Sequence, residues 1–256
     1  MDSILKSKTV SAPIEITPEI EKWKASGEEL IEPQGEFRAR QRAWDIPRIE
    51  QTQKSLLAKA DQVSRARLLA AEQPESGAWA TAIPVPSLGT QLNPEELRIA
   101  IALRTGSEVC VERPCKCGKI IDKLGYHSLS CNKSEGRSPR HTAINEIIWR
   151  ALKAAEIKSR LEPEGIDRGD NLRPDGLTSQ PFSQGKALCW DATCVDTFCE
   201  SYVHECATVA GSAATKAEIR KRNKYQEMGR RYKFEPIAIE TTGVYGSTTR
   251  TIIKEI

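Results

Sequence analysis

Four side chains of the kinds that bind zinc lie close together in the sequence. They are Cys115, Cys117, His127 and Cys131, in the pattern C-x-C-x9-H-x3-C. Gly118 permits a tight turn after the first pair, and His127 and Cys131 would share one face of a helical turn. Zinc binds thiolates and imidazoles tetrahedrally, and four protein ligands leave no open position for catalysis. The spacing therefore predicts a structural zinc site.

The cysteines allow two further interpretations. The first pair has one intervening residue where zinc ligand pairs have roughly two to four, so Cys110 could replace Cys115 or Cys117 as a ligand. A second group lies downstream and consists of Cys189, Cys194, Cys199, His204 and Cys206. Because Cys189 lies in an apolar segment, buried thiols acting as small hydrophobic side chains are favoured over a second metal site.

Two aspartates could form a catalytic metal site. Asp175 follows Arg173-Pro174 in a turn, and Asp191 comes after fifteen intervening residues, inside an apolar segment. A charge within an apolar strand is unfavourable unless it is paired or binds a metal. The two strands of a hairpin could bring both carboxylates together, where magnesium or manganese would bind them. Glu162 could add a third oxygen ligand, whereas a solvated Asp175 and a hydrogen-bonded Asp191 are the alternative.

A lysine beside these acids would complete a site that hydrolyses phosphodiesters, because it could hold the phosphate or the attacking water. The residue two positions after Asp191, on the same strand face, is Thr193. A later helix offers Lys221 and Lys224, which share one helical face with Tyr225. Either ammonium group could project toward the acids, and solvation of both is the alternative.

Helices and strands must position these side chains. Apolar residues at helical spacing predict helices over residues 46–71, 93–106, 140–155 and 213–232. Strand patterns cover residues 158–162, 187–195 and 234–241, and a turn at Arg173-Pro174-Asp175 leads into a further strand. The Pro-rich segment 73–89 is expected to be an extended connector. The order from Arg140 onward predicts an α/β fold with a mixed sheet flanked by helices.

These motifs occur in one order that resembles the C-terminal region of non-LTR retrotransposon proteins with a restriction-like endonuclease. The motifs are Cys115-x-Cys117-Gly118, Gly125-x-His127-x3-Cys131, Arg140-His141 with Asn145, Leu161-Glu162-Pro163, Arg173-Pro174-Asp175-Gly176, Trp190-Asp191 and Lys221-x2-Lys224-Tyr225. In that family a zinc knuckle precedes a PD-(D/E)XK nuclease that nicks target DNA. The resemblance covers roughly residues 76–246 and implies a restriction-endonuclease-like core.

The resemblance also implies roles for individual residues. The catalytic set would be Asp175, Asp191, Glu162, and Lys221 or Lys224, with magnesium or manganese bound by the two aspartates. The residues that would contact nucleic acid are Arg140, His141, Arg173, Arg220 and Tyr225. For Tyr225, packing is favoured over stacking on a base.

Four regions are expected along the chain. Residues 1–36 should be loosely ordered, residues 37–109 should form a helical region with the Pro-rich connector, residues 110–135 the zinc-binding module, and residues 136–256 the restriction-endonuclease-like domain. No reverse transcriptase pattern is present, although such an enzyme belongs to the retrotransposon proteins. The chain would therefore be a truncated or decayed element, or a host protein that kept the module.

Composition sets the remaining expectations. The net charge is only +3, but basic residues cluster over residues 216–233, where they could contact DNA or RNA or form a solvated helix face. No apolar run reaches membrane-spanning length and the N-terminus lacks a signal peptide, so we expect an intracellular protein without a membrane partner. The basic cluster at residues 220–224 is a weak nuclear import signal.

The leading hypothesis is a metal-dependent endonuclease that hydrolyses DNA. One rival is a catalytically inactive, zinc-dependent DNA- or RNA-binding protein, or a retroelement remnant. Another is a zinc-stabilised protein-interaction domain that binds no nucleic acid.

Overall fold

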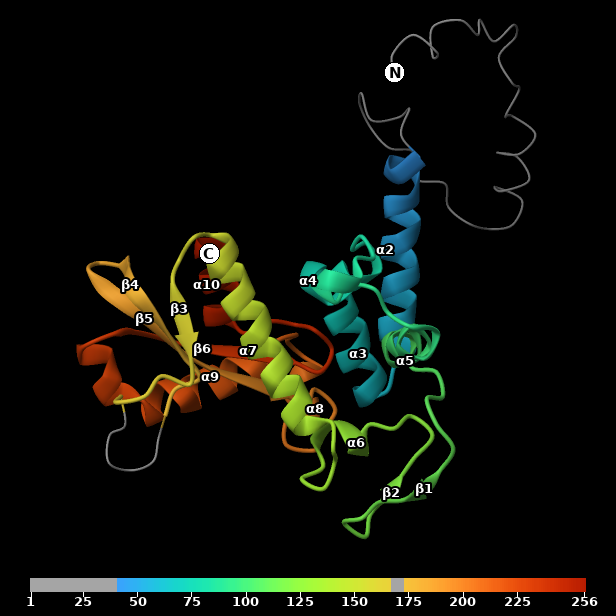
Figure 1. The fold of residues 1–256 in the computed structure, drawn as a ribbon. Coiled ribbons are helices and arrows are strands. Elements are labelled where there is room, and N and C mark those ends of the chain that lie inside the picture. The colour runs from blue at the N-terminus through green and yellow to red at the C-terminus, as the bar shows by residue number, and fades with distance from the viewer. Residues whose placement is uncertain (1–40, 167–172) are drawn as a thin grey trace, which may run out of the picture. The chain divides into compact units, whose positions relative to one another are not determined.

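A computed structural model describes residues 41–166 and 173–256 (Figure 1). The chain divides into two compact units, with the boundary between Lys59 and Ala60. The described part of the first unit is helix α2 (Gln41–Lys59). The expectation that residues 1–36 are loosely ordered lies outside the described residues. All further elements belong to the second unit.

A break separates α2 from helix α3 (Gln62–Glu72), although the sequence predicted one helix over residues 46–71. Asp61 lies at the break with an extended backbone (φ −66°, ψ 175°), and its carboxylate accepts a hydrogen bond from the Ser64 N–H at 2.7 Å. An aspartate in this position caps the otherwise unpaired N–H groups of a new helix. The prediction of a continuous helix was therefore wrong.

The Pro-rich segment is more ordered than the extended connector that was predicted. It contains helix α4 (Pro74–Gly77) and the 3₁₀ turns Ala78–Ala80 and Pro86–Leu88. Helix α5 (Pro94–Thr105) follows as predicted, with a capping box formed by Asn93 and Glu96. It ends at Gly106, whose φ of 75° is the left-handed conformation common after helices.

A small hairpin and a one-turn helix form the module that the sequence predicted to bind zinc. Strand β1 (Arg113–Pro114) pairs antiparallel with β2 (Ile120–Ile121), and helix α6 (His127–Ser130) follows. Gly118 lies in the hairpin turn with φ 90° and donates its N–H to the Cys115 carbonyl at 2.9 Å. This conformation favours glycine, so the predicted tight turn is confirmed.

The C-terminal part is a mixed α/β fold, as predicted (Figure 1). Its elements in chain order are α7 (Arg137–Ala154), β3 (Ser159–Leu161), β4 (Gly176–Ser183), β5 (Lys186–Val195), α8 (Val203–Cys206), α9 (Ser212–Lys224), β6 (Lys233–Glu240) and α10 (Ser247–Glu255). The strands lie in the order β3-β4-β5-β6, with antiparallel pairing except between β5 and β6, which are parallel. A parallel pair requires a crossover, which α8 and α9 provide.

Strand β5 is covered on both faces. Leu188 and Trp190 pack with side chains of α7 and α10, whereas Cys189 packs with Tyr225, directly after α9. Because successive strand residues point to opposite faces, Asp191 lies on the same face as Cys189. The sheet therefore directs an acidic side chain toward the basic helix α9, which contacts β5.

The C-terminal helices differ from the predicted elements. The helix predicted over residues 213–232 ends at Lys224 and is followed by the 3₁₀ helix Gln226–Arg230. Helix α10 was not predicted. Its first turn is capped by the buried Glu218 carboxylate, which accepts hydrogen bonds from the N–H groups of Thr248 at 2.9 Å and Thr249 at 2.8 Å. A carboxylate at a helix N-terminus stabilises it through these bonds and through the helix dipole.

Replacing Gly176 by Ala is expected to destabilise the sheet. A Cβ atom at this position would lie 1.9 Å from Cζ2 of Trp190, a side chain with no exposed surface. Such an overlap in a packed core costs about 1–3 kcal/mol, because Trp190 or the strand must shift. Denaturant unfolding should show a lower midpoint, with Gly229→Ala as the control, since a Cβ there meets no atom within 4 Å. An unchanged midpoint for Gly176→Ala would contradict this packing.

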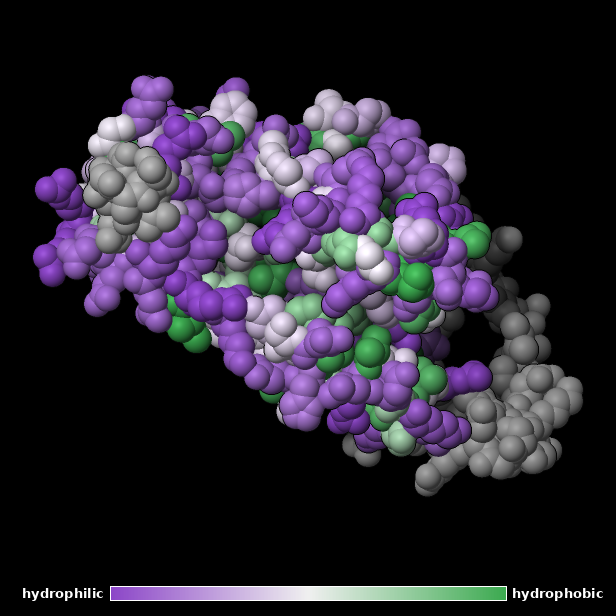
Figure 2. Space-filling view, turned by 90° about the horizontal axis from the view of Figure 1, so that it is seen from below, coloured by the Kyte–Doolittle hydropathy of each residue, from purple (hydrophilic) through white to green (hydrophobic). Residues whose placement is uncertain are grey.

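Polar side chains dominate the face drawn in Figure 2, and hydrophobic residues form separate groups among them. Charged residues make up 29% of the sequence, which accounts for this surface. None of the described helices is both long and apolar enough to cross a membrane.

Candidate functional site

The four predicted zinc ligands come together at the hairpin and α6, and we call them the zinc cluster. The sulfur atoms of Cys115 and Cys131 are 3.6 Å apart, and the Cys117 sulfur lies 3.1 Å from Nε2 of His127. All four ligand atoms lie within 4.8 Å of one another. Ligand atoms on a tetrahedral zinc ion are separated by about 3.5–3.8 Å. The donor set and its spacing therefore fit structural zinc.

Cys110 is not part of the zinc cluster. Its Sγ atom lies 3.3 Å from the Asp122 carbonyl oxygen, at which the thiol hydrogen points. The four converging ligand atoms include both Cys115 and Cys117, so the close C-x-C pair supplies two ligands without a replacement.

One thiol of the zinc cluster, Cys117, favours the ionised thiolate that zinc binds, whereas the pKa of Cys115 is raised. The pKa of Cys117 is lowered to about 6, chiefly by a hydrogen bond from the Lys119 N–H and further by contacts with the rest of the cluster. At neutral pH most of the Cys117 thiol is therefore already ionised, and zinc binding releases few protons from it.

The downstream cysteines are arranged differently. Cys189 and Cys206 have no exposed surface, as predicted for buried thiols, and burial raises the pKa of Cys189 to about 12. His204 hydrogen-bonds to Gln62 at 2.8 Å. Within the described ranges, no group of three or more Cys, His, Asp or Glu donors besides the zinc cluster converges.

Asp175 and Asp191, which we call the acidic pair, are neighbours across the β4–β5 ladder. Gly176 pairs with Trp190, and the Asp175 N–H donates to the Trp190 carbonyl at 3.0 Å, so Asp175 lies beside the residue that precedes Asp191. Oδ2 of Asp175 also accepts a hydrogen bond from the Ala192 N–H at 2.6 Å. The hairpin thus joins two acids that are distant in the sequence.

Asp191 is only 4% exposed, and its two oxygens have different partners. Oδ1 accepts a hydrogen bond from the Tyr225 hydroxyl at 2.9 Å, and Oδ2 forms an ion pair with Nζ of Lys221. Burial and the negative charge of Asp191 raise the pKa of Tyr225, so its hydroxyl stays protonated and donates. Helix α9 and the residue after it therefore present a cation and a hydroxyl to one carboxylate.

The packing of α9 distinguishes the two lysines that the sequence proposed. Lys221 reaches Asp191, and its ammonium also lies 3.4 Å from the Ala192 carbonyl. Lys224 instead lies 5.0 Å from the ring centre of Tyr225, in a cation–π contact. Lys221 is therefore the lysine at the acidic pair.

The first turns of α7 approach Asp175 from another element. Nε2 of His141 lies 3.0 Å from Oδ2 of Asp175 and 3.5 Å from Nδ2 of Asn145. Asn145 is buried, and its Oδ1 accepts a hydrogen bond from the Trp190 indole N–H at 3.1 Å. His141, predicted to contact nucleic acid, is thus a direct partner of an acidic-pair carboxylate.

No protein-family model matches this chain, and a search of curated proteins found no match. The chemistry of the chain must be inferred from the residues that its fold brings together. Two such places stand out in the described residues, the zinc cluster and the acidic pair.

Glu162 lies near the acidic pair only through its backbone. Its N–H donates to the Asp175 carbonyl at 2.8 Å, but its carboxylate pairs with Arg173 and its side chain is 72% exposed. Among the described residues, the ligand atoms of Glu162 and the acidic pair do not form a group that could hold a metal ion together. Glu162 therefore does not supply the predicted third oxygen ligand, because its carboxylate is paired with Arg173.

Three other residues predicted to contact nucleic acid make contacts within the chain. A guanidinium N–H of Arg140 donates to the Leu129 carbonyl, and the Arg220 guanidinium lies 5.4 Å from the ring centre of Tyr202. Tyr225 is 1% exposed, which confirms packing and corrects its assignment as a nucleic-acid contact. Arg140 and Tyr225 therefore stabilise the fold.

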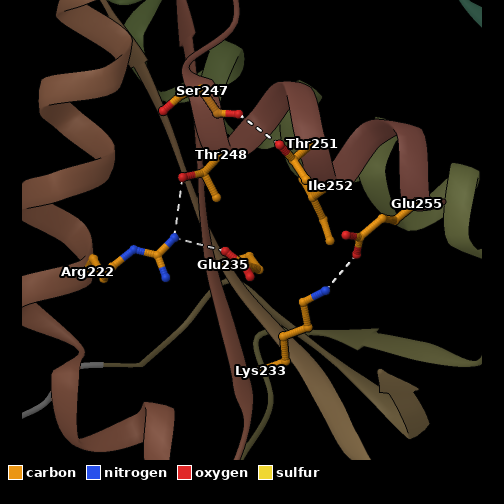
Figure 3. A pocket seen from close by; sticks show the side chains of 8 residues that line it. All are labelled: Arg222, Lys233, Glu235, Ser247, Thr248, Thr251, Ile252 and Glu255. Carbon is orange, nitrogen blue, oxygen red and sulfur yellow. Dashed lines mark hydrogen bonds and ion pairs between the residues drawn. The ribbon is translucent and has the colours of Figure 1, made fainter. Parts of the chain in front are cut away.

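A pocket of about 330 Å³ lies among α9, β6 and α10 (Figure 3). Its cations, Arg222 and Lys233, are paired with Glu235 and Glu255. Arg222 also donates to the Thr248 hydroxyl at 3.3 Å. These charges balance one another and neither acid of the acidic pair lines the pocket, so the pocket is separate from the candidate site at the acidic pair.

Proposed function

We propose that this chain is a metal-dependent DNA endonuclease with a restriction-endonuclease-like core, related to the nucleases of non-LTR retrotransposon proteins. The observation that carries the proposal is that Asp175 bonds to the two residues that flank Asp191, with Lys221 bound to Asp191 itself. Two acids on adjacent strands with a lysine beside them are functional groups suited to metal-dependent hydrolysis of phosphodiesters. The mixed sheet between helices supports the same assignment.

Magnesium or manganese suits the acidic pair. These ions bind through one or two carboxylates together with water and phosphate oxygens, so the pair offers a sufficient donor set without Glu162. When bound, the ion would stabilise the negative charge that develops on the phosphate. The Ala192 N–H and the Tyr225 hydroxyl already hold the two carboxylates in place.

Three side chains of the protein would assist the reaction. Lys221 keeps a positive charge at Asp191, where it can neutralise a phosphate that approaches the acidic pair. His141 fixes the orientation of the Asp175 carboxylate, and Tyr225 fixes that of Asp191. Groups held by such contacts need little rearrangement during the reaction.

Replacing Lys221 by Met is expected to lower the rate of DNA nicking by about 100-fold, because it removes the cation from the acidic pair. Lys224→Met is the matched control, since it makes the same change on the same helix beside the Tyr225 ring. At saturating DNA we expect it to nick at nearly the wild-type rate. Equal losses in the two variants would contradict the assignment of Lys221.

Nicking of supercoiled DNA tests the proposed function. The zinc-loaded chain should nick DNA when magnesium or manganese is added and should not nick it without a divalent ion. Salt-sensitive binding without nicking would instead indicate a catalytically inactive, zinc-dependent DNA- or RNA-binding protein. A chain that neither binds nor nicks would contradict both.

A further inference from the structure

Arg140 lies between the zinc cluster and the acidic pair. It is in the first turn of α7, directly before His141. One terminal N–H of its guanidinium donates to the Leu129 carbonyl in α6, and its Nε–H donates to the Gly136 carbonyl at 3.1 Å, where α7 begins. The side chain therefore ties the start of α7 to α6.

The carbonyl that Arg140 binds belongs to the segment that carries two members of the zinc cluster. Helix α6 has four residues, His127–Ser130, and is followed directly by Cys131, whose N–H donates to the His127 carbonyl at 3.1 Å. A helix of one turn is not stable by itself, because nucleation fixes several residues for one hydrogen bond. Zinc held by His127 and Cys131 would keep the Leu129 carbonyl in place.

The residue after Arg140 contacts the acidic pair. Nε2 of His141 lies 3.0 Å from Oδ2 of Asp175, and the same oxygen accepts the Ala192 N–H at 2.6 Å. A shift of the first turn of α7 would therefore move His141 relative to Asp175. The hydrogen bond from the Ala192 N–H would also weaken, because it is accepted by the same Oδ2 atom of Asp175.

A second contact holds the zinc-binding module to the sheet. The rings of Tyr126 and Phe198 are stacked, with centroids 4.1 Å apart and an angle of 18° between their planes. Tyr126 directly precedes α6, and Phe198 lies just beyond β5, the strand that carries Asp191. Ser130 of α6 also hydrogen-bonds to the Asp196 carboxylate, so the described part of the module contacts the core at several points. Among them, Arg140 is the residue directly before a partner of Asp175.

We propose that Arg140 is a positioning residue through which zinc binding fixes the contact between His141 and Asp175. Its guanidinium donates hydrogen bonds to two main-chain carbonyls. This positioning role takes the place of the nucleic-acid contact that the sequence resemblance implied. The proposal concerns the geometry of Asp175. It can therefore be tested independently of whether the acidic pair cleaves DNA.

Nuclear magnetic resonance of the histidine rings tests the coupling at one fixed pH. The chain contains three histidines, so the ring signals can be assigned with single His→Gln variants. Removing zinc with a chelator is expected to shift the signals of His127 and His141, and to leave that of His204, which is bonded to Gln62, in place. Exchange of the Ala192 amide hydrogen should accelerate by about fivefold, as for a weakened hydrogen bond.

A variant tests the route through Arg140 without removing the metal. Zinc-loaded Arg140→Lys should keep its zinc, yet show the His141 signal and the Ala192 exchange rate of the zinc-free wild type. Arg150→Lys makes the same change on the exposed side of α7 and should match the zinc-loaded wild type. The proposal is overturned if zinc removal leaves His141 and Ala192 unchanged, or if Arg140→Lys behaves like Arg150→Lys. The chelation experiment uses the native sequence, so an unchanged His141 signal there overturns the proposal even where the variant does not fold.

Discussion

Replacing Cys131 by Ser is expected to abolish stoichiometric zinc binding and to lower the free energy of unfolding by about 3 kcal/mol or more. Cys131 is the buried member of the zinc cluster, at 8% exposure, and a serine hydroxyl does not replace a thiolate on zinc. Because a hairpin with two-residue strands and a one-turn helix have little core of their own, much of the metal-binding free energy becomes folding free energy. Metal analysis of the purified chain and thermal unfolding measure the two effects.

Cys110→Ser is the matched control for that experiment. It makes the same atomic change in the same module, at a thiol that bonds to the Asp122 carbonyl. We expect one zinc ion per chain and unchanged unfolding. The ligand assignment would be wrong if Cys131→Ser retained its zinc, or if Cys110→Ser lost it.

The zinc cluster could be predicted from the sequence because its geometry is local. Its outermost ligands are separated by 16 positions, and glycine marks the turn that closes the first pair. What the spacing left open was the choice between Cys110 and the close pair Cys115 and Cys117. The structure favours the close pair, because the ligand atoms of Cys115 and Cys117 lie within 4.8 Å of those of His127 and Cys131.

The acidic pair was predictable as a hairpin, but its neighbours were not. An acid inside an apolar strand and an acid in the preceding turn indicate a common site, and the register of β4 on β5 provides it. Periodicity placed Lys221 and Lys224 on one helical face and could not separate them. Only the packing of α9 against β5 does so, and that packing depends on contacts 30 positions apart in the sequence.

Two buried glutamates were missed altogether. Glu218 and Glu240 are each 2% exposed, and Glu240 accepts a hydrogen bond from the Ala213 N–H at 3.1 Å at the start of α9. A signal was present, since α9 and α10 begin after Gly211 and Gly246, and glycine offers no side chain to cap a helix. The N–H groups of helices that start this way need a hydrogen-bond acceptor from elsewhere in the chain, and long-range packing decides which residue supplies it.

The proposed enzyme depends on the charges of the acidic pair. Asp191→Asn keeps the size of the side chain and can still accept a hydrogen bond from Tyr225, but it removes the charge that Lys221 and a divalent ion would bind. Asp175→Asn makes the same change at the partner of His141. We expect each to lower the nicking rate by more than about 100-fold, because charge stabilisation at the phosphate would be lost.

Asp196→Asn is the control for these variants. Asp196 follows β5 and is also buried, and its carboxylate accepts hydrogen bonds from the Phe198 N–H and the Thr241 hydroxyl, both at 3.1 Å. Burial raises the pKa of Asp196, so a neutral amide is tolerated there better than at a paired carboxylate. We expect this variant to nick DNA as the wild type does, with circular dichroism showing that all three variants are folded.

The rate of magnesium-dependent nicking of supercoiled DNA, compared between the wild type and Asp191→Asn purified in the same way, tests the central claim most directly. We expect the wild type to nick DNA and the variant to retain no more than about one hundredth of that rate while still folding and binding zinc. Equal nicking by the two chains would show that the cleavage does not come from the acidic pair.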